Sequence, residues 1–299
     1  MNNEKLKKNK IVVWAYGFSR RILTRISPTL ASKFMYRVSK GKSLNLKDPK
    51  EFDEKLMWLK LKKYNNNPLV TECADKYRVR DYVKRKGCEE CLNELIAVYD
   101  NPNQIKWEDL PNQFVIKCNH GSGYNLICDD KSKFDFEDAK KKIKKWFKED
   151  FYLENAEVNY KYIKKKIICE KYLKTDDGFV PNDYKFFCFH GEPVTALACY
   201  DREEDLQMVF MDSEWKPTKI GREEYYNGKP VRKPVSYDKM VELSRILSKD
   251  FPFVRMDFYD YKGKAILGEM TFIPCGANSD AYTEYGNKFL SSKLHLDIK

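Results

Sequence analysis

Two acidic residues near the C-terminal end of the chain lie in apolar segments, where a charged side chain is unusual. Asp257 lies in the segment 253–258 and Glu269 in the segment 265–272, and the short turn 261–264 separates them. If the two segments are strands of one hairpin, their carboxylates face each other. Paired carboxylates suit Mg²⁺, which binds carboxylate oxygens together with nucleotide phosphate oxygens.

Arg255 adds a positive charge to this pair. It precedes Asp257 by two residues, so both side chains point to the same face of the predicted strand. An arginine beside metal-binding carboxylates can bind a transferring phosphoryl group or an acyl phosphate. The alternative is a structural ion pair between Arg255 and Asp257, with Glu269 exposed. The residues alone leave both interpretations open.

A second set of candidates surrounds Gly121-Ser122-Gly123. Lys117 lies four residues before the first glycine, on the predicted strand 114–118, and a second predicted strand follows at 125–128. A P-loop places its lysine after the glycines and continues into a helix, so this pattern excludes one, and a dinucleotide fingerprint fails for the same reason. Backbone N–H groups in such a hairpin turn can still bind phosphate, within reach of Lys117. A plain turn is the alternative.

Glu170 stands out in the apolar segment 167–173, at a position where its neighbours are expected to be buried. A nucleotide base in an apolar slot, recognised by backbone groups and one carboxylate, would account for it. A paired surface glutamate is the alternative.

The elements that must position these residues change along the chain. Residues 1–110 show mostly helical apolar spacing, clearest at 54–61 and 75–83, and a further helix is predicted from 136 to 147. Helices followed by a largely antiparallel sheet predict an α+β fold rather than a doubly wound one. The predicted strands after residue 166, with one helix at 237–249 among them, are 167–173, 184–190, 194–200, 206–211, 253–258 and 265–272.

Charge and cysteine usage narrow the class of protein. The net charge of +11 favours acidic partners such as nucleotides, nucleic acid, anionic polysaccharide or a membrane surface. The nine cysteines are an odd number scattered through core-like segments, which predicts a reducing, cytoplasmic location rather than a disulfide framework.

The N-terminal segment 1–44 has its own character. Its apolar run, residues 11–18, is too short to span a bilayer, and no secretory cleavage site follows it. One hypothesis is an interfacial helix on the inner face of the membrane, and the other is a packed helix with a solvated basic face. The basic residues around the run are Lys5, Lys7, Lys8, Lys10, Arg20, Arg21 and Arg25.

Taken together, these segments resemble a known family. The order Lys117, Glu170, Lys185, Arg255-Met-Asp257 and Glu269-Met-Thr271 is similar to the nucleotide-binding elements of ATP-grasp enzymes. Over roughly residues 45–290, the amino-acid sequence resembles more closely still the TupA-like branch of these enzymes. That branch is associated with teichuronic acid and other bacterial surface polysaccharides. The segments that carry this match are FDEKLMWLK from Phe52, ADKYRVR from Ala74, LPNQFVIKCNHGSG from Leu110 and EMTFIP from Glu269.

The resemblance implies an ATP cleft between two α+β lobes. Lysines would contact the phosphates, the glycine flap would close over them, and strand 167–173 would line the adenine and ribose site. The nucleotide-binding residues implied in this way are Lys76, Lys117, Gly121, Ser122, Gly123, Glu170, Lys171 and Leu173.

The resemblance also implies the catalytic and metal residues. Lys185 would approach the phosphates and Arg255 would steady the acyl phosphate, while Asp257 and Glu269 would bind Mg²⁺. Thr271 stands where ATP-grasp enzymes usually have a third, asparagine ligand, and a hydroxyl is a poorer metal ligand than an amide oxygen. The implied division is a basic N-terminal segment 1–44, a helix-rich region 45–112, a lid lobe 113–168 and an adenine and Mg²⁺ lobe 169–299.

The activity implied is an ATP- and Mg²⁺-dependent carboxylate–amine ligase that works through an acyl phosphate. Its partners would be ATP and an acidic saccharide or amino acid, in bacterial capsular or teichuronic polysaccharide biosynthesis. A glycosyltransferase is one alternative, although an Asp-x-Asp motif is not evident in a suitable turn. A non-catalytic protein that binds anionic glycan or nucleic acid is the other. Nucleic acid is the less expected partner, because the basic and aromatic residues also make ordinary amphipathic elements.

Overall fold

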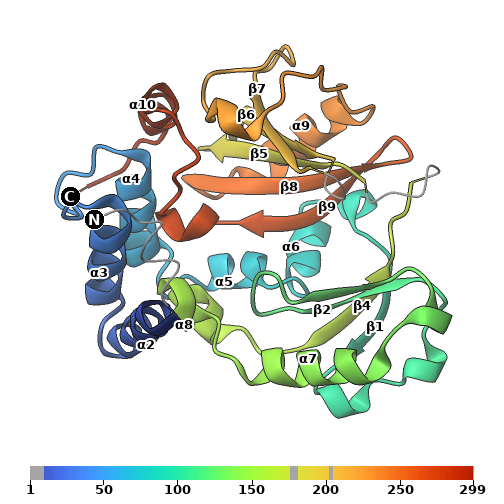
Figure 1. The fold of residues 1–299 in the computed structure, drawn as a ribbon. Coiled ribbons are helices and arrows are strands. Elements are labelled where there is room, and N and C mark those ends of the chain that lie inside the picture. Colours follow the sequence, from blue (N-terminus) through green and yellow to red (C-terminus); the bar gives the residue numbers. More distant parts are fainter. Residues whose placement is uncertain (1–9, 176–180, 202–204, 299) are drawn as a thin grey trace.

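The chain folds around two antiparallel sheets that face each other. A computed structural model describes residues 10–175, 181–201 and 205–298 (Figure 1). The smaller sheet has four strands in the order β1-β4-β2-β3, and the larger has five in the order β7-β6-β5-β8-β9. Helix α9 packs on the large sheet and α7 on the small one. The predicted α+β class is confirmed.

The small sheet is built from segments far apart in the sequence. The predicted hairpin is confirmed, with Phe114 opposite Cys128 and Lys117 opposite Asn125. Apolar residues of β2 and β4 form its core with Ile143 of α7. Its strands are β1 (Leu95–Tyr99), β2 (Phe114–Cys118), β3 (Asn125–Cys128) and β4 (Ile167–Lys171), and α7 spans Phe136–Lys148.

Strand β1 is an exception to the mostly helical spacing expected of residues 1–110. Its five residues are all half-buried, because β1 is an edge strand whose neighbour in the sheet is β4. The sheet therefore runs from residue 95 to residue 171. It draws one strand from the region 45–112 and ends three residues beyond position 168.

The large sheet follows the predicted strands closely, with ends that differ by three residues at most. Its inner strands are buried on both faces, which explains the long apolar runs of β5 and β8. The strands are β5 (Asp183–Phe189), β6 (Glu192–Tyr200), β7 (Gln207–Met211), β8 (Phe253–Tyr261) and β9 (Lys264–Thr271), and α9 spans Tyr237–Ser248.

Short helices surround the sheets, and α5 and α6 lie between them (Figure 1). The predicted helix 75–83 starts late because the Asp75 carboxylate accepts bonds from the backbone N–H groups of Tyr77 and Arg78, which fixes a turn ahead of α6. The helices are α2 (Lys10–Ile26), α3 (Pro28–Lys40), α4 (Phe52–Trp58), a π-helical turn (Leu59–Lys63), α5 (Pro68–Ala74), α6 (Val79–Arg85), α8 (Tyr152–Asn155) and α10 (Glu284–Lys293). Single 3₁₀ turns occupy Glu89–Cys91, Pro102–Gln104, Trp107–Asp109, Lys131–Lys133, Val158–Tyr162, Glu223–Tyr225 and Pro274–Ala277.

Candidate active site

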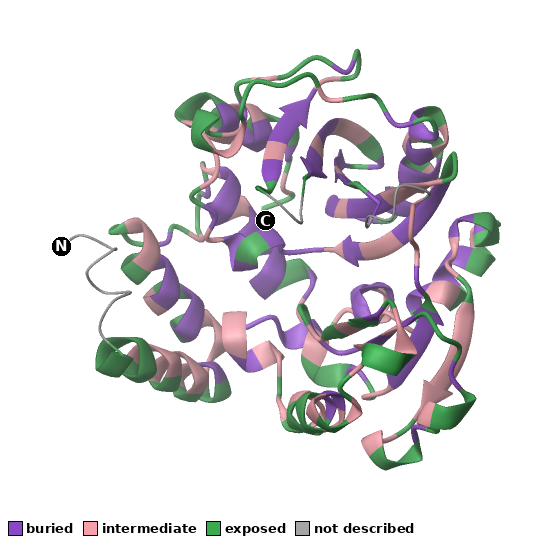
Figure 2. Cartoon of the chain, turned by 45° about the vertical axis from the view of Figure 1, so that its right-hand side comes forward, coloured by how far each residue is buried: buried purple, intermediate pink, exposed green. Residues whose placement is uncertain are grey.

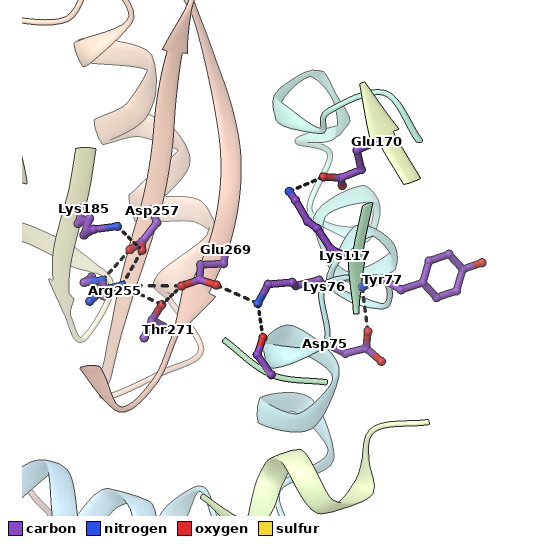
Figure 3. Close-up of polar contacts among 11 residues, drawn as sticks. Asp75, Lys76, Tyr77, Lys117, Glu170, Lys185, Arg255, Asp257, Glu269 and Thr271 are labelled. Atoms are coloured by element: carbon purple, nitrogen blue, oxygen red, sulfur yellow. Dashed lines mark hydrogen bonds and ion pairs between the residues drawn. The ribbon is translucent and has the colours of Figure 1, made fainter. Parts of the chain in front are cut away.

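The predicted carboxylate pair forms on the face of the large sheet that looks toward the small one. Asp257 on β8 lies directly opposite Glu269 on β9. On the other side, Lys185 of β5 lies opposite Asp257, and its Nζ is 2.9 Å from Asp257 Oδ2. Arg255 donates two hydrogen bonds to Asp257, at 2.7 Å and 2.6 Å (Figure 3). The strand register therefore gathers these charges at one point.

Glu269 continues the same network toward the other lobe. Its Oε1 accepts a 3.0 Å bond from the Thr271 hydroxyl, which itself accepts a 3.2 Å bond from Arg255. Its Oε2 lies 3.0 Å from the Nζ of Lys76 (Figure 3). The Lys76 ammonium, followed by Arg255, holds the pKa of Glu269 well below its usual range, although burial opposes this. The alternative raised above, a structural Arg255–Asp257 ion pair with Glu269 exposed, is met only in part: the pair forms, but Glu269 is paired as well.

Lys185 and Arg255, the two cations beside Asp257, keep their protons. Burial alone would lower the pKa of Lys185, but Asp257 and then Asp183 raise it above its ordinary value. Burial likewise opposes the charge of Arg255, and Asp257 more than compensates, so its pKa is raised further. Both side chains can therefore offer permanent positive charge to an anionic ligand.

Lys76 connects the flap to this network. Its Nζ donates a 2.9 Å bond to the carbonyl oxygen of Gly121 while it also contacts Glu269. A Cβ at Gly121 would lie 2.6 Å from the ring of Tyr124, so only glycine fits there. Gly123 has a left-handed backbone with φ of +75° and open space around it, and Ser122 is exposed. The predicted flap is thus a tight turn with one crowded and one open glycine.

The base of the flap is fixed by Asn119, which is completely buried. Its Nδ2 donates to Asp75 Oδ1 at 2.8 Å and to the Lys164 carbonyl at 3.0 Å, and its Oδ1 accepts from the Lys166 N–H at 2.7 Å. The next residue, His120, is also buried, with Nε2 3.1 Å from the Trp146 carbonyl. Burial lowers the pKa of His120 to about 4, so the ring is neutral and donates this bond.

A pocket lies between the sheets beside these residues. Glu170 is 7% exposed, and its carboxylate lies 2.6 Å from Lys117 Nζ and 3.7 Å from Arg80 Nη1, so it is not a surface glutamate. Lys171 borders the pocket, but its ammonium is 3.4 Å from exposed Glu94. The pocket is lined by Asn93, Val115, Lys117, Asn125, Ile127, Glu170, Lys171, Tyr172, Leu173, Pro181, Tyr259, Ile266, Leu267 and Gly268.

The structure thus brings the predicted residues into two adjoining groups. Lys117, Glu170, Lys171 and Leu173 line the pocket, while Lys185, Arg255, Asp257, Glu269 and Thr271 form the charged network. Lys76 and the flap residue Gly121 join that network through the lysine. Ser122 and Gly123 lie next to Gly121 in the flap. In the described part of the chain, neither residue takes part in the hydrogen bonds and ion pairs given above.

Several contributors were not predicted. Arg80 contacts Glu170, and although it lies in the predicted helix 75–83, nothing in that segment signalled the contact. Asp183 pairs with Lys185, two residues along the same strand. Asn119, Tyr259 and Leu267 gave no signal, because only the fold brings them to the flap base or the pocket.

Most of the chain matches a known protein-family model. Residues 54–293 match the model described as TupA-like ATPgrasp. The chain belongs to the TupA-like ATP-grasp family. The fold assignment rests on this match. No curated protein matches the chain.

Solved ATP-grasp structures show partial likeness to this family member. One is D-alanine–D-alanine ligase from Bacillus anthracis complexed with ATP, at 14% identity and TM-score 0.46, with 75% of this chain and 65% of that one covered. Another is the ATP-grasp ligase PsnB with its minimal precursor, at 12% identity and TM-score 0.40, covering 80% and 66%. N5-carboxyaminoimidazole synthase from Aspergillus clavatus with ADP and 5-aminoimidazole ribonucleotide gives 11% identity and TM-score 0.39, covering 67% and 44%. The chain thus spans two thirds or less of the length of these proteins.

Proposed function

We propose that this TupA-like ATP-grasp protein is an ATP- and Mg²⁺-dependent carboxylate–amine ligase. The observation that carries the proposal is the continuous network from Lys185 through Asp257, Arg255, Thr271 and Glu269 to Lys76, placed beside a pocket between two sheets. Such a network can neutralise a polyphosphate at one end while the pocket takes a planar base at the other.

The nucleotide would lie across the small sheet. The base would enter the apolar pocket against Leu173 and Leu267, with the Glu170 carboxylate and the backbone near Lys171 at its polar edge. Lys117, now 2.6 Å from Glu170, would turn toward the phosphates. The amides of Gly121, Ser122 and Gly123 would close over the terminal phosphates, with Lys76 beneath them.

The donors fit magnesium when it arrives with phosphate. Asp257 and Glu269 offer hard carboxylate oxygens on facing strands, which Mg²⁺ prefers. Within residues 10–175, 181–201 and 205–298, no three side chains of His, Cys, Asp or Glu gather closely enough to hold a metal ion. Three negative charges stand against three positive ones, 3 − 3 = 0, so little net attraction remains for a bare cation. The charges are those of Asp183, Asp257, Glu269, Lys76, Lys185 and Arg255.

The chemistry then follows from charge placement. A substrate carboxylate attacks the γ-phosphorus of ATP, which gives an acyl phosphate and ADP, and an amine then displaces phosphate and forms an amide. Bound Mg²⁺ would neutralise phosphate oxygens during the transfer. Arg255 and Lys185 would hold the negative oxygens of the transferring group, because their positive charges are fixed by Asp257. Thr271 would orient Glu269 through its 3.0 Å bond rather than act as a strong ligand.

For the substrates, we propose an amide linkage between an amino acid or amine and a uronic-acid or similar carboxylate. The TupA-like family suggests bacterial capsular or teichuronic polysaccharide biosynthesis, in the cytoplasm where ATP is available. The net charge of +11 is compatible with an acidic glycan.

The test is ATP-dependent phosphate release with uronic-acid glycans screened against amino acids. Mg²⁺-ATP should raise the melting temperature, whereas UDP-sugars and oligonucleotides should not. Asp257→Asn and Glu269→Gln should abolish turnover and keep the fold, while Glu214→Gln, an exposed control, should retain it. Absence of any stabilisation by Mg²⁺-ATP, or normal turnover in both site variants, would overturn the proposal.

A further inference from the structure

Helix α2 carries an apolar stripe that faces solvent. Ile11, Trp14, Phe18, Ile22 and Ile26 recur at helical spacing, and all are exposed, with Ile11 at 76%, Trp14 at 67% and Ile26 at 70%. Figure 2 shows the first turns of this helix in green, the colour of exposed residues. Such a stripe normally faces the core of its own protein, so its outward direction needs a partner.

The opposite side of α2 is already packed. Tyr16 and Leu23 lie against a small cluster formed by Ala31, Met35 and Ala156. Arg21 Nη1 lies 2.6 Å from Glu154 Oε1 on α8, and Arg20 contacts the same carboxylate. The stripe therefore cannot turn inward without breaking these contacts.

The next helix, α3, anchors the pair to the body of the protein. Ser39 Oγ donates a 2.8 Å bond to Asn278 Oδ1, Lys40 contacts the Ser279 carbonyl, and Lys40 Nζ lies 2.6 Å from Asp53. The Ser27 hydroxyl caps α3, and Pro28 begins it, so the turn between the helices is short and defined. The helical hairpin 10–40 is thus a fixed platform.

The charge of this hairpin is one-sided. Residues 10–40 contain no Asp or Glu, and their basic residues are Lys10, Arg20, Arg21, Arg25, Lys33, Arg37 and Lys40. Within the described part of the chain, Lys10, Arg25, Lys33 and Arg37 form no ion pair. Apolar and aromatic residues flanked by unpaired cations match the boundary between anionic headgroups and acyl chains.

We propose that the hairpin 10–40 docks the protein on an anionic lipid bilayer through the outer face of α2. A second copy of the chain is a poorer partner, because a two-fold contact would bring two acid-free cationic surfaces together. A nucleic acid would use the cations but would leave the aliphatic stripe in water. No helix in the described residues is both long and apolar enough to cross a membrane. The proposed attachment through α2 stands independently of the ligase proposal.

The experiment uses the full chain in a flotation assay with vesicles. Phosphatidylcholine vesicles are compared with vesicles that also contain phosphatidylglycerol. The wild type should float only with the anionic vesicles and should be released by high salt. The double variant Trp14→Asp/Phe18→Asp should lower partitioning by roughly tenfold or more. The double variant Arg25→Glu/Lys33→Glu should lower it by a similar factor.

Matched controls separate this surface from general stickiness. Lys141→Glu/Lys144→Glu reverses two exposed charges on α7, and Val235→Asp replaces a 72% exposed apolar residue elsewhere, so both should keep wild-type partitioning. Equal loss in the α7 variant would overturn the proposal, as would equal binding to neutral vesicles or no binding at all. A dimer in light scattering that Trp14→Asp/Phe18→Asp dissociates would assign the stripe to a second copy instead.

Discussion

Replacing Lys76 with methionine tests the central link of the site. The Nζ of Lys76 lies 3.0 Å from Glu269 Oε2, and the two side chains are 16% and 30% exposed. At an effective dielectric constant near 20, the direct attraction at that distance is about 5 kcal/mol. Dehydration of both groups and lost lysine rotamers offset more than half of it. We therefore expect Lys76→Met to lower the free energy of unfolding by about 2 kcal/mol at neutral pH.

The pH dependence identifies the cause. Because Lys76 depresses the pKa of Glu269 in the folded state, the ion pair contributes stability that is fully present above the unfolded pKa, near 4.3. That contribution falls as the pH drops through the lower, folded pKa. The difference between wild type and Lys76→Met should thus stay constant from pH 7 to about pH 5 and shrink below about pH 4.

Urea denaturation across this pH range measures the difference directly. Lys216→Met removes an exposed ion pair with Glu214, each side chain 70% exposed, and should cost well under about 1 kcal/mol at any pH. A Lys76→Met difference as small as that of Lys216→Met, or one that does not shrink in acid, would refute the proposed electrostatic link.

The remaining predictions concern the flap. Gly121→Ala should lower the free energy of unfolding by about 1–3 kcal/mol, because its Cβ would lie 2.6 Å and 2.9 Å from the rings of Tyr124 and Phe151. Gly123→Ala, with φ of +75° and open space, should lower it by only about 1 kcal/mol through backbone strain. Equal losses for the two variants in urea denaturation would contradict the packing described for Gly121. Asn119→Ala should cost about 2–4 kcal/mol, because it removes three hydrogen bonds made by a completely buried side chain, and a loss below about 1 kcal/mol would show that the partner groups find other partners. Burial lowers the pKa of His120 to about 4, so between pH 6.5 and 4 the unfolded state binds more protons than the folded state. The free energy of unfolding should therefore fall by up to about 3 kcal/mol as the pH drops through this range. His120→Gln, which keeps a donor, should flatten that slope, and an unchanged slope would exclude His120 as its source.

Much of the large sheet was predictable because its signals are local. The strands of 253–261 and 264–271 have strong apolar runs and a short turn, so the hairpin itself follows from local pattern. The opposition of Asp257 and Glu269 also depends on a register shift between Asp257 and Phe258, which the turn length does not report. Strand β1 was not predictable in this way. It is a half-buried edge strand whose partner, β4, lies some seventy residues later, and nothing in its own alternation reports that pairing.

The charged network was less predictable than its members. The spacing of two residues predicts that Arg255 and Asp257 lie on the same face of strand β8. The contact of Lys76 with Glu269, in contrast, depends on how α5 and α6 lie between the sheets. The same holds for Arg80 and Glu170. Contacts between side chains of different lobes depend on tertiary packing, whereas the sequence of one strand predicts only which of its own side chains share a face.

The anchored base of the glycine flap limits how the cleft can open. A backbone bond of 2.9 Å from the Cys118 N–H to the Tyr124 carbonyl closes the loop, and Asn119 and His120 are held inside it. Only the three residues from Gly121 to Gly123 remain to swing, and fully extended they reach about 10 Å. A loop this short is expected to move with the small sheet, so on the proposed function a nucleotide would enter by rotation of the two lobes rather than by motion of the loop alone. A spectroscopic label at Ser122 should accordingly report a change in the angle between the two sheets, and not an independent motion of the loop.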